Sequence, residues 1–359
     1  MTDTAIQSDE VLLDHVGSAA VIRLNRPKAL NSLNLAMVRD MKAAMERFAG
    51  DPEVSCVIVK GEGERGLCAG GDIRVIHEMG KAHDPEVTRF WREEFPLNYM
   101  ISRYEKPYVV LMDGIVMGGG VGISSHGKHR VVTERTRLAM PETGIGYVPD
   151  VGATWLLPHA PGETGTWMAL TGEMVGAADA IYANLADACV PSERLQGLVE
   201  ALGELKGGAS DEQARAVIDR FAVVPGEGQF AIHRDLIDRT FRFDRVEEVV
   251  AALNKEEGEF AVRTREIISK RSPTSLKLAL RLLRLGRASS SLVECLEREF
   301  TAGVEILRHH DFYEGVRAAI IDKDRNPKWR PATLEEVSEA DLDRYFAVRH
   351  PVLFADHRL

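Results

Sequence analysis

The 359-residue chain has few cysteines and no arrangement of residues typical of a metal site. Its four cysteines, Cys56, Cys68, Cys189 and Cys295, lie far apart and form no CxxC pair. This spacing argues against both a zinc site and a disulfide framework. The eleven histidines likewise show no ligand spacing, so the sequence predicts no metal ion.

Positive charge is also scarce, because 45 Lys and Arg residues face 55 Asp and Glu residues, for a formal net charge of -10. Nucleic-acid phosphates attract clustered Lys and Arg, so we expect no nucleic-acid partner. A small phosphorylated ligand stays compatible, since it needs only a local basic spot. The sequence has no apolar run long enough to span a membrane and no apolar signal segment near its start. We therefore expect no membrane association and a location in the reducing cytoplasm.

What the first half does contain is an alternation of short apolar segments with helical patterns. Residues 11–13 and 19–24 flank a turn at Gly17-Ser18 and predict a hairpin. Asn34 is placed to cap a helix whose apolar residues recur at helical spacing through residue 48. Together with the apolar segments 56–59 and 108–112, this alternation predicts an α/β fold with buried parallel strands. Later segments predict helices, namely 162–190, 192–205, 211–221 and 245–317 with a break at Ser272-Pro273.

Two glycine-rich segments stand out against this background. Gly118-Gly119-Gly120 directly follows the apolar segment 107–117, and Gly70-Gly71 precedes Asp72. Glycine lets bare backbone approach a ligand, and the first N–H groups of a helix point outward. One amide from each segment is compatible with an oxyanion hole, although spacing alone does not establish that the two converge. An isolated Gly-Gly-Asp is also compatible with a tight loop that has no chemical role.

Two carboxylates lie in a loop rich in glycine and proline over residues 140–152. These are Glu142, after Pro141, and Asp150. Loops of this composition often position catalytic groups. The alternative is that Glu142 or Asp150 is a helix cap or a surface charge, and Asp150 is a good cap candidate for the helix that follows. A dinucleotide site is not expected at the G-x-G-x-x-G pattern of residues 61–66, because two glutamates occupy the place of the pyrophosphate.

Four segments occur in an order that resembles the crotonase (enoyl-CoA hydratase/isomerase) superfamily. They are residues 25–31 (NRPKALN), 68–73 (CAGGDI), 117–122 (MGGGVG) and 140–146 (MPETGIG). Within this superfamily the chain is most similar to the branch that hydrolyses 3-hydroxyisobutyryl-CoA in valine breakdown. It has Gly122 where hydratases carry one of their two catalytic glutamates, and Asp150 where they usually carry glycine. Residues 310–331 also resemble the hydrolases, and the resemblance extends from about residue 10 to 346.

The resemblance implies a crotonase (ClpP-like) fold of repeated ββα units. It places the acyl-CoA site in a core over residues 1–205. A helical C-terminal region follows over residues 206–359, with an insertion around 207–262. Crotonase cores usually assemble as trimers or pairs of trimers, so a homo-oligomer is possible.

The resemblance also assigns roles to individual residues at the thioester. The amides of Gly71 and Gly119 would form the oxyanion hole, and Glu142 would either activate water or attack the thioester to form a mixed anhydride. Asp150 is expected near the 3-hydroxyl of the substrate. Glu94 aligns with another substrate-contacting carboxylate, its alternative being a solvated charge on a helix.

At the other end of the substrate, the backbone of Lys28, Ala29 and Leu30 is expected to bind the CoA adenine. Arg74 is a further candidate for contact with phosphate. The implied reaction needs no cofactor, because CoA is part of the substrate. Two alternatives stay open: hydration of an enoyl-CoA, with Asp150 partly restoring the missing carboxyl pair, and a non-catalytic acyl-CoA-binding protein.

Overall fold

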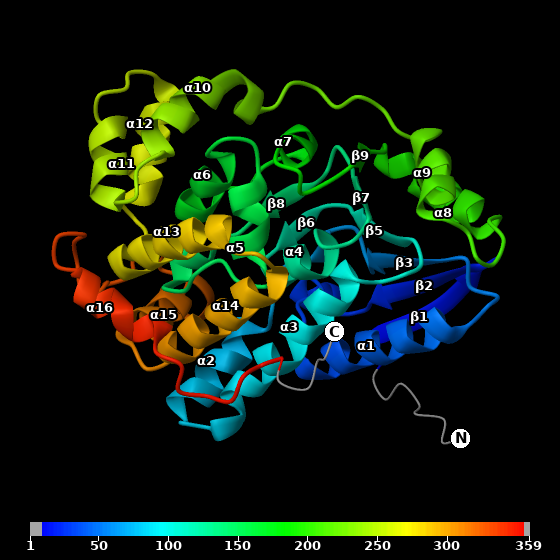
Figure 1. Ribbon diagram of the computed structural model, residues 1–359, viewed down its shortest axis with the longest axis horizontal. Coiled ribbons are helices and arrows are strands. Elements are labelled where there is room, and N and C mark those ends of the chain that lie inside the picture. The colour runs from blue at the N-terminus through cyan, green and yellow to red at the C-terminus, as the bar shows by residue number, and fades with distance from the viewer. Residues whose placement is uncertain (1–8, 355–359) are drawn as a thin grey trace. The chain divides into compact units, whose positions relative to one another are not determined.

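The computed structural model describes residues 9–354 (Figure 1). The chain divides into two compact units, each composed of three separate stretches. The first unit consists of the described residues up to Gly71, Pro96–Leu138 and Val175–Gly228. The second consists of Asp72–Phe95, Ala139–Met174 and the described residues from Gln229 onward. The division expected at residue 205 stays a prediction, and the expectation for the first eight residues lies outside the described part.

The first unit is organised around a six-stranded sheet in the order β1-β2-β3-β5-β7-β9. The hairpin predicted at Gly17-Ser18 is confirmed, since β1 and β2 pair antiparallel, and the remaining neighbours pair in parallel, as expected. The strands are β1 (Val11–Val16), β2 (Ala19–Leu24), β3 (Cys56–Gly61), β5 (Tyr108–Met112), β7 (His129–Val132) and β9 (Ala188–Cys189).

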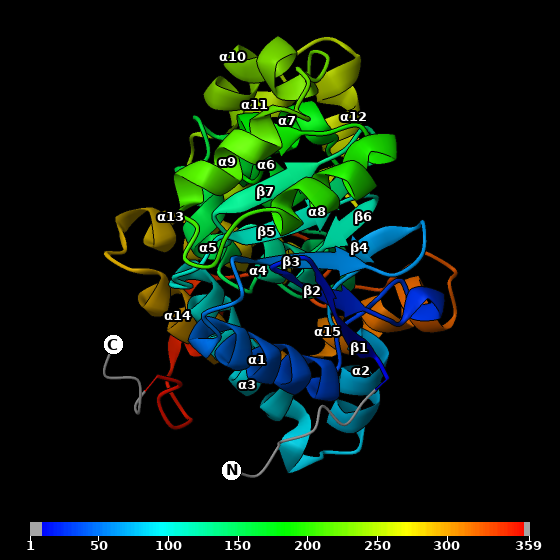
Figure 2. The ribbon, with the colours of Figure 1, turned by 90° about the vertical axis from the view of Figure 1, so that its right-hand side faces the viewer.

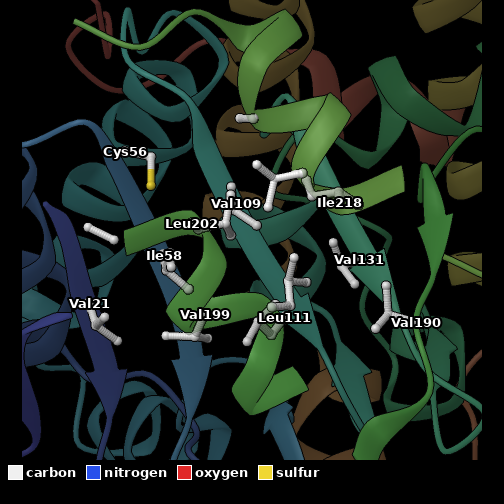
Figure 3. Packing of buried hydrophobic residues seen from close by; sticks show 14 residues of the cluster. Val21, Cys56, Ile58, Val109, Leu111, Val131, Val190, Val199, Leu202 and Ile218 are labelled. Atoms are coloured by element: carbon white, nitrogen blue, oxygen red, sulfur yellow. The ribbon is translucent and has the colours of Figure 1, made fainter. Parts of the chain in front are cut away.

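Helices pack on this sheet. On one face, α8 (Leu195–Gly203) and α9 (Asp211–Asp219) bury an apolar cluster that includes Val21, Ile58 and Val109 (Figure 3). Alternate strand residues point to the other face. Figure 2 shows α1 (Leu35–Gly50) on the other side of β1–β3 from α8. Asn34 caps α1 as predicted, because its side chain accepts a hydrogen bond from the amide of Met37 at 2.9 Å.

A smaller sheet in the order β4-β6-β8 lies beside the glycine segments. Its strands are β4 (Gly66–Cys68), β6 (Ile115–Met117) and β8 (Arg137–Ala139), and the helix α4 (Gly119–Ser124) follows β6. Strands β4 and β6 pair in parallel. Both therefore end at the same edge, and the chain continues from there into Gly70-Gly71 and Gly118-Gly119.

The second unit is mainly helical. Its α6 contacts α10 and α12 through aromatic side chains, since the ring of Trp167 stacks on Phe260 and meets Phe230 edge-on. Among the described residues no helix is both long and apolar enough to cross a membrane. The helices are α2 (Ile73–Lys81), α5 (Ala153–Leu156), α6 (Thr164–Thr171), α10 (Gln229–Phe241), α11 (Val246–Leu253), α12 (Glu259–Ile268), α13 (Pro273–Ala288), α14 (Leu292–Ile306), α15 (His310–Val316) and α16 (Glu339–Asp343). One more helix, α3 (Arg89–Ser102), begins in this unit and ends in the first.

The helix predicted over residues 162–190 is wrong in its second half. Helix α6 ends at Gly172, which adopts a left-handed conformation (φ 63°) that glycine tolerates. A short helix, α7 (Ala177–Tyr182), follows, and Ala188-Cys189 then pairs with β7 as the edge strand β9. A strand of two residues is too short to leave a periodic signal in the sequence.

Candidate active site

The two glycine segments predicted to form an oxyanion hole are adjacent within the first unit. Gly70 adopts a φ of +104°, and a Cβ atom placed on it would lie 3.3 Å from the carbonyl oxygen of Met117 and 3.7 Å from the amide nitrogen of Gly119. A side chain at position 70 would therefore be strained and would press on the second segment. The carbonyl of Gly70 accepts a hydrogen bond from the amide of Leu33 at 2.8 Å, which anchors the turn.

The predicted donors themselves have amides that are available for a ligand. Gly119 is the first residue of α4 and follows Gly118, whose φ is 47°. The first N–H groups of a helix have no partner within it. Over residues 9–354, no backbone carbonyl accepts a hydrogen bond from the amide of Gly71 or Gly119. The structure thus supplies two backbone donors on neighbouring segments. That both amides bind the same oxygen atom of a ligand stays a prediction.

The residues expected to bind the CoA adenine form a short turn in the same unit. Lys28 and Ala29 belong to the 3₁₀ helix η1 (Pro27–Ala29), and Leu30 has a φ of 52°. The buried side chain of Asn31 holds this turn by donating to the carbonyls of Glu62 (3.1 Å) and Gly66 (3.0 Å).

Arg74, the phosphate candidate, lies on α2 in the second unit. Its side chain is exposed and donates to the carbonyl of Ile320 at 3.1 Å. A contact of Arg74 with phosphate therefore stays a prediction.

The second unit buries four acidic side chains that interact with one another, here called the carboxyl cluster. Glu94 lies on α3, Glu142 begins the 3₁₀ helix η3 (Glu142–Ile145), Asp150 precedes α5, and Glu299 lies on α14. Their exposed fractions are 1%, 7%, 6% and 0%. The alternative of a solvated surface charge is therefore wrong for Glu94, Glu142 and Asp150.

Burial raises the pKa of every member of the carboxyl cluster, because the ionised form loses its hydration. The charge of Asp150 further raises the pKa values of Glu94 and Glu142. The charge of Glu299 further raises the pKa values of Asp150 and Glu142. Carboxyl groups this close titrate as a set and share protons. The cluster can therefore hold a proton donor and a strong base side by side at neutral pH.

Glu299 organises the segment that follows Asp150. Its carboxylate accepts hydrogen bonds from the amide of Gly152 (2.7 Å) and from the amide (2.9 Å) and hydroxyl (2.6 Å) of Thr154. Burial raises the pKa of Glu299 to about 7 even though these bonds oppose the rise. Asp150 is not the helix cap that the sequence alternative offered: Gly152 is the N-cap of α5, and Glu299 binds its amide.

Two aromatic residues complete the surroundings of Asp150, and the sequence did not identify either. Tyr147 stacks on Trp91, with ring centroids 5.6 Å apart and an interplanar angle of 10°. Among the described residues, the buried Tyr147 hydroxyl has no hydrogen-bond partner, and the same is true of one oxygen each of Glu94 and Glu142. The Tyr147 hydroxyl lies near enough to Asp150 to reduce the rise in the pKa of Asp150, although the two groups do not have hydrogen-bond geometry. Unpaired buried polar atoms are costly, so a group of them indicates a site for a polar ligand.

The carboxyl cluster is not arranged as a metal centre. Over residues 9–354, no group of three or more His, Cys, Asp or Glu side chains is placed to hold a metal ion. Each of the four cysteines is buried, as is typical of small core residues.

The comparison with family models gives the class of the protein. The model described as enoyl-CoA hydratase/isomerase matches residues 19–346. The chain therefore belongs to the enoyl-CoA hydratase/isomerase family, as its four motifs predicted. Two curated relatives, from Danio rerio and Homo sapiens, are each named 3-hydroxyisobutyryl-CoA hydrolase, mitochondrial. The first is 45% identical over 343 residues, covering 94% of this chain and 89% of the relative. The second is 44% identical over 350 residues, covering 96% and 89%.

Solved structures confirm the predicted crotonase fold with its helical C-terminal region. A protein described as a carnitinyl-CoA dehydratase from Mycobacterium thermoresistibile is 42% identical, with a TM-score of 0.91 over 96% of this chain and 98% of that one. Another, described as an enoyl-CoA hydratase from Rhodobacter sphaeroides 2.4.1, is 40% identical, with a TM-score of 0.86 over 94% and 97%. The curated relatives are named as mitochondrial, so the expected cytoplasmic location is not confirmed.

Proposed function

We propose that this protein is an acyl-CoA thioesterase whose substrate is 3-hydroxyisobutyryl-CoA, which it hydrolyses to 3-hydroxyisobutyrate and CoA. The curated relatives that carry this activity in their names match it over nearly its whole length. The chain also has the two chemical parts that acyl transfer needs: free backbone donors beside glycine, and a buried glutamate with a raised pKa.

The feature that favours hydrolysis over hydration is the pairing of Glu142 with Asp150 rather than with an acid at position 122. Hydration of an enoyl thioester uses two carboxyl groups, one to deprotonate water and one to protonate the α-carbon. Position 122 is a buried glycine of α4 and offers no such group. Hydrolysis requires attack only at the carbonyl carbon, for which one glutamate and an oxyanion hole suffice.

In the proposed reaction, the amides of Gly71 and Gly119 stabilise the oxyanion, with about 3 kcal/mol from each donor. Glu142 takes the proton of the attacking water, or its carboxylate attacks and water then cleaves the mixed anhydride. In either route the C–S bond breaks, the CoA thiolate leaves and takes up a proton, and the free acid forms. The raised pKa of Glu142 makes it a stronger base than an exposed glutamate.

The other carboxyl groups are assigned to the acyl part of the substrate. We propose that Asp150 and Glu94 bind the 3-hydroxyl, which can donate to an ionised carboxylate or accept from a protonated one. Among the described residues, one oxygen each of Glu94 and Glu142 and the Tyr147 hydroxyl lack hydrogen-bond partners, which is compatible with a polar ligand in this place. The backbone of Lys28, Ala29 and Leu30 would bind adenine, and Arg74 would bind phosphate.

A thiol-release assay with purified protein and 3-hydroxyisobutyryl-CoA tests the proposal. Release of CoA thiol is expected at a rate far above spontaneous hydrolysis. Loss of enoyl absorbance with crotonyl-CoA and no thiol release would instead establish a hydratase. Calorimetric binding of CoA without turnover of any thioester would establish a non-catalytic binding protein.

Three further properties complete the proposal. Catalysis is expected to need no cofactor, so activity should survive dialysis against EDTA. A homo-oligomer, typical of this family, should be visible by light scattering coupled to size exclusion. Cytoplasmic location stays our expectation, and cell fractionation would decide between it and the mitochondrial location of the named relatives.

A further inference from the structure

The segment over residues 142–154 carries both Glu142 and Asp150, and one face of α14 is built to hold it. Glu299 lies on that face with no exposed surface. One of its carboxylate oxygens accepts from the amide of Gly152, and the other from the amide and hydroxyl of Thr154. All the partners that bind Glu299 thus follow Asp150 by two to four residues.

A carboxylate at this buried position is energetically unfavourable. The buried residues of α14 are mostly apolar, although Thr301 and Glu305 are also buried, and the apolar Leu296 and Phe300 flank Glu299. Burying an ionised group costs several kcal/mol unless hydrogen bonds compensate it, and an apolar residue often gives equal or greater stability. Glutamine would not preserve these hydrogen bonds. Its side-chain NH2 group is itself a donor and would face one of the N–H or O–H groups that donate to Glu299.

Two glycines bring the same segment close to its helices. A Cβ atom on Gly303 of α14 would lie 2.4 Å from the Tyr147 hydroxyl, and one on Gly286 of α13 would lie 1.7 Å from the carbonyl oxygen of Thr154. Only glycine permits either approach. The segment is therefore fixed at Tyr147 on one side of Asp150 and at Gly152 and Thr154 on the other.

We propose that Glu299 is a positioning residue for thioester hydrolysis, which fixes the carboxyl group of Asp150 by holding the backbone at Gly152 and Thr154. Because it binds no substrate itself, its effect is transmitted through the orientation and the proton affinity of its neighbours. This role rests on the proposed thioesterase activity and adds a residue that the sequence motifs do not contain.

The charge of Glu299 acts on other residues of the segment that its hydrogen bonds hold. It raises the pKa values of Asp150, Glu142 and Tyr147. On its own helix, Arg298 lowers the pKa of Glu299, and the thiol of Cys295 lies near it. From the other packed elements, Arg92 of α3 lies over the ring of Phe300 and Tyr345 of η7 (Arg344–Phe346) interacts with Glu305. Removal of the Glu299 charge should therefore lower the pKa of Asp150.

The test compares Glu299→Gln with Glu297→Gln, which makes the same change on the same helix at a half-buried glutamate whose side chain accepts a hydrogen bond from the amide of Phe354 at 2.8 Å. We expect Glu299→Gln to lower kcat by about 100-fold, the loss typical of a small misplacement of reacting groups. KM for 3-hydroxyisobutyryl-CoA should change by less than about threefold. The limb of the pH–kcat profile set by Asp150 should move to lower pH, a shift that a purely structural defect would not produce. Glu297→Gln should match the wild type in all three measurements.

A second variant covers the case in which Glu299→Gln fails to fold. Thr154→Val removes only the hydroxyl that donates to Glu299 and should lower kcat by about tenfold with the far-UV circular dichroism unchanged. In the double variant the two losses should be less than additive, because both remove the same interaction.

The outcomes separate this role from the proposed function. An active wild type, with Glu299→Gln and Thr154→Val both retaining its kcat and pH profile, would overturn the role of Glu299 alone. A wild type that releases no CoA thiol would overturn the thioesterase and the positioning role together.

Discussion

The two units of the molecule contribute different kinds of chemical group. The first supplies backbone: its strands end in glycine segments, over a core of aliphatic side chains, and within residues 9–354 the amides of Gly71 and Gly119 donate to no backbone carbonyl. The second supplies side chains: within residues 9–354, every Asp or Glu with a raised pKa lies there. Amide donors need only rigid strands and the absence of Cβ atoms, whereas buried acids need many neighbours to hold them. This difference explains why the sequence predicts the amide donors from local motifs but does not predict which residues hold the buried acids in place.

The largest effect should come from the second unit, through Glu142→Gln. Loss of the base or nucleophile is expected to lower kcat by about 10³-fold, within the usual range for such groups. The same change replaces a buried carboxyl group, whose pKa is raised, with a neutral amide. The melting temperature should therefore rise.

Thiol release and calorimetry would measure the two effects of Glu142→Gln. The variant Glu173→Gln, at a residue of the same unit that pairs with Arg263, serves as control. Full activity in Glu142→Gln would remove Glu142 from the mechanism.

A backbone change in the first unit should be nearly as damaging without touching any acid. Gly70→Ala introduces a Cβ at a φ of +104° and beside Met117 and Gly119. It should displace the donors and lower kcat by about 10²-fold, as removal of one oxyanion donor does.

Gly208→Ala is the matched control, since Gly208 also has a positive φ (+77°) but open space around its Cβ. Steady-state kinetics of both variants would separate backbone strain from loss of the donors. Equal kcat values in the two would contradict a role for this segment.

Asp150→Asn should show how far the acids depend on one another. It is expected to lower kcat by about 10-fold to 100-fold through loss of a substrate contact. It also removes the charge that raises the pKa of Glu142, so the remaining acidic limb of the pH–rate profile should move to lower pH. A limb that stays in place would show that Glu142 and Asp150 titrate independently.

The smallest effect concerns stability rather than rate. The pKa of Glu299 is about 7 in the folded protein and about 4.3 in an unfolded chain, so between these values the folded state binds more protons. Its contribution is therefore fully present below about pH 4 and is lost as the pH rises through about 7. Relative to Glu299→Gln, the wild type should lose on the order of 1–3 kcal/mol between pH 4.5 and 7.5. Urea unfolding at several pH values would measure this, and parallel curves for the two proteins would contradict it.

Short-range signals in the sequence were sufficient for much of the fold and part of the site. The cap at Asn34, the hairpin at Gly17-Ser18 and the buried strand at residues 56–59 depend on neighbouring residues and were confirmed. Glu299 was not identified, because a glutamate reads as a surface charge and its partner Gly152 is 147 residues away. The available signal was its place between Leu296 and Phe300 on the apolar stripe of a helix.

Tyr147 and Trp91 were missed for a related reason. Aromatic residues are common in cores, and only the folded structure shows a buried hydroxyl with no partner. The alternative of a helix cap at Asp150 was wrong because the sequence cannot show that a distant carboxylate satisfies the amides at the start of α5.

The separation between Gly152 and Glu299 has a consequence for synthesis of the protein on the ribosome. Residues 142–154 leave the exit tunnel well before α14 has been translated. Until then the amides of Gly152 and Thr154 lack their acceptor, Glu299. A chain stopped at residue 298 would still contain every family motif in the first 152 residues, yet the loop bearing Asp150 would have no acceptor from α14. Nonsense products of this length would thus be recognisable as members of the family by sequence while being inactive in the cell.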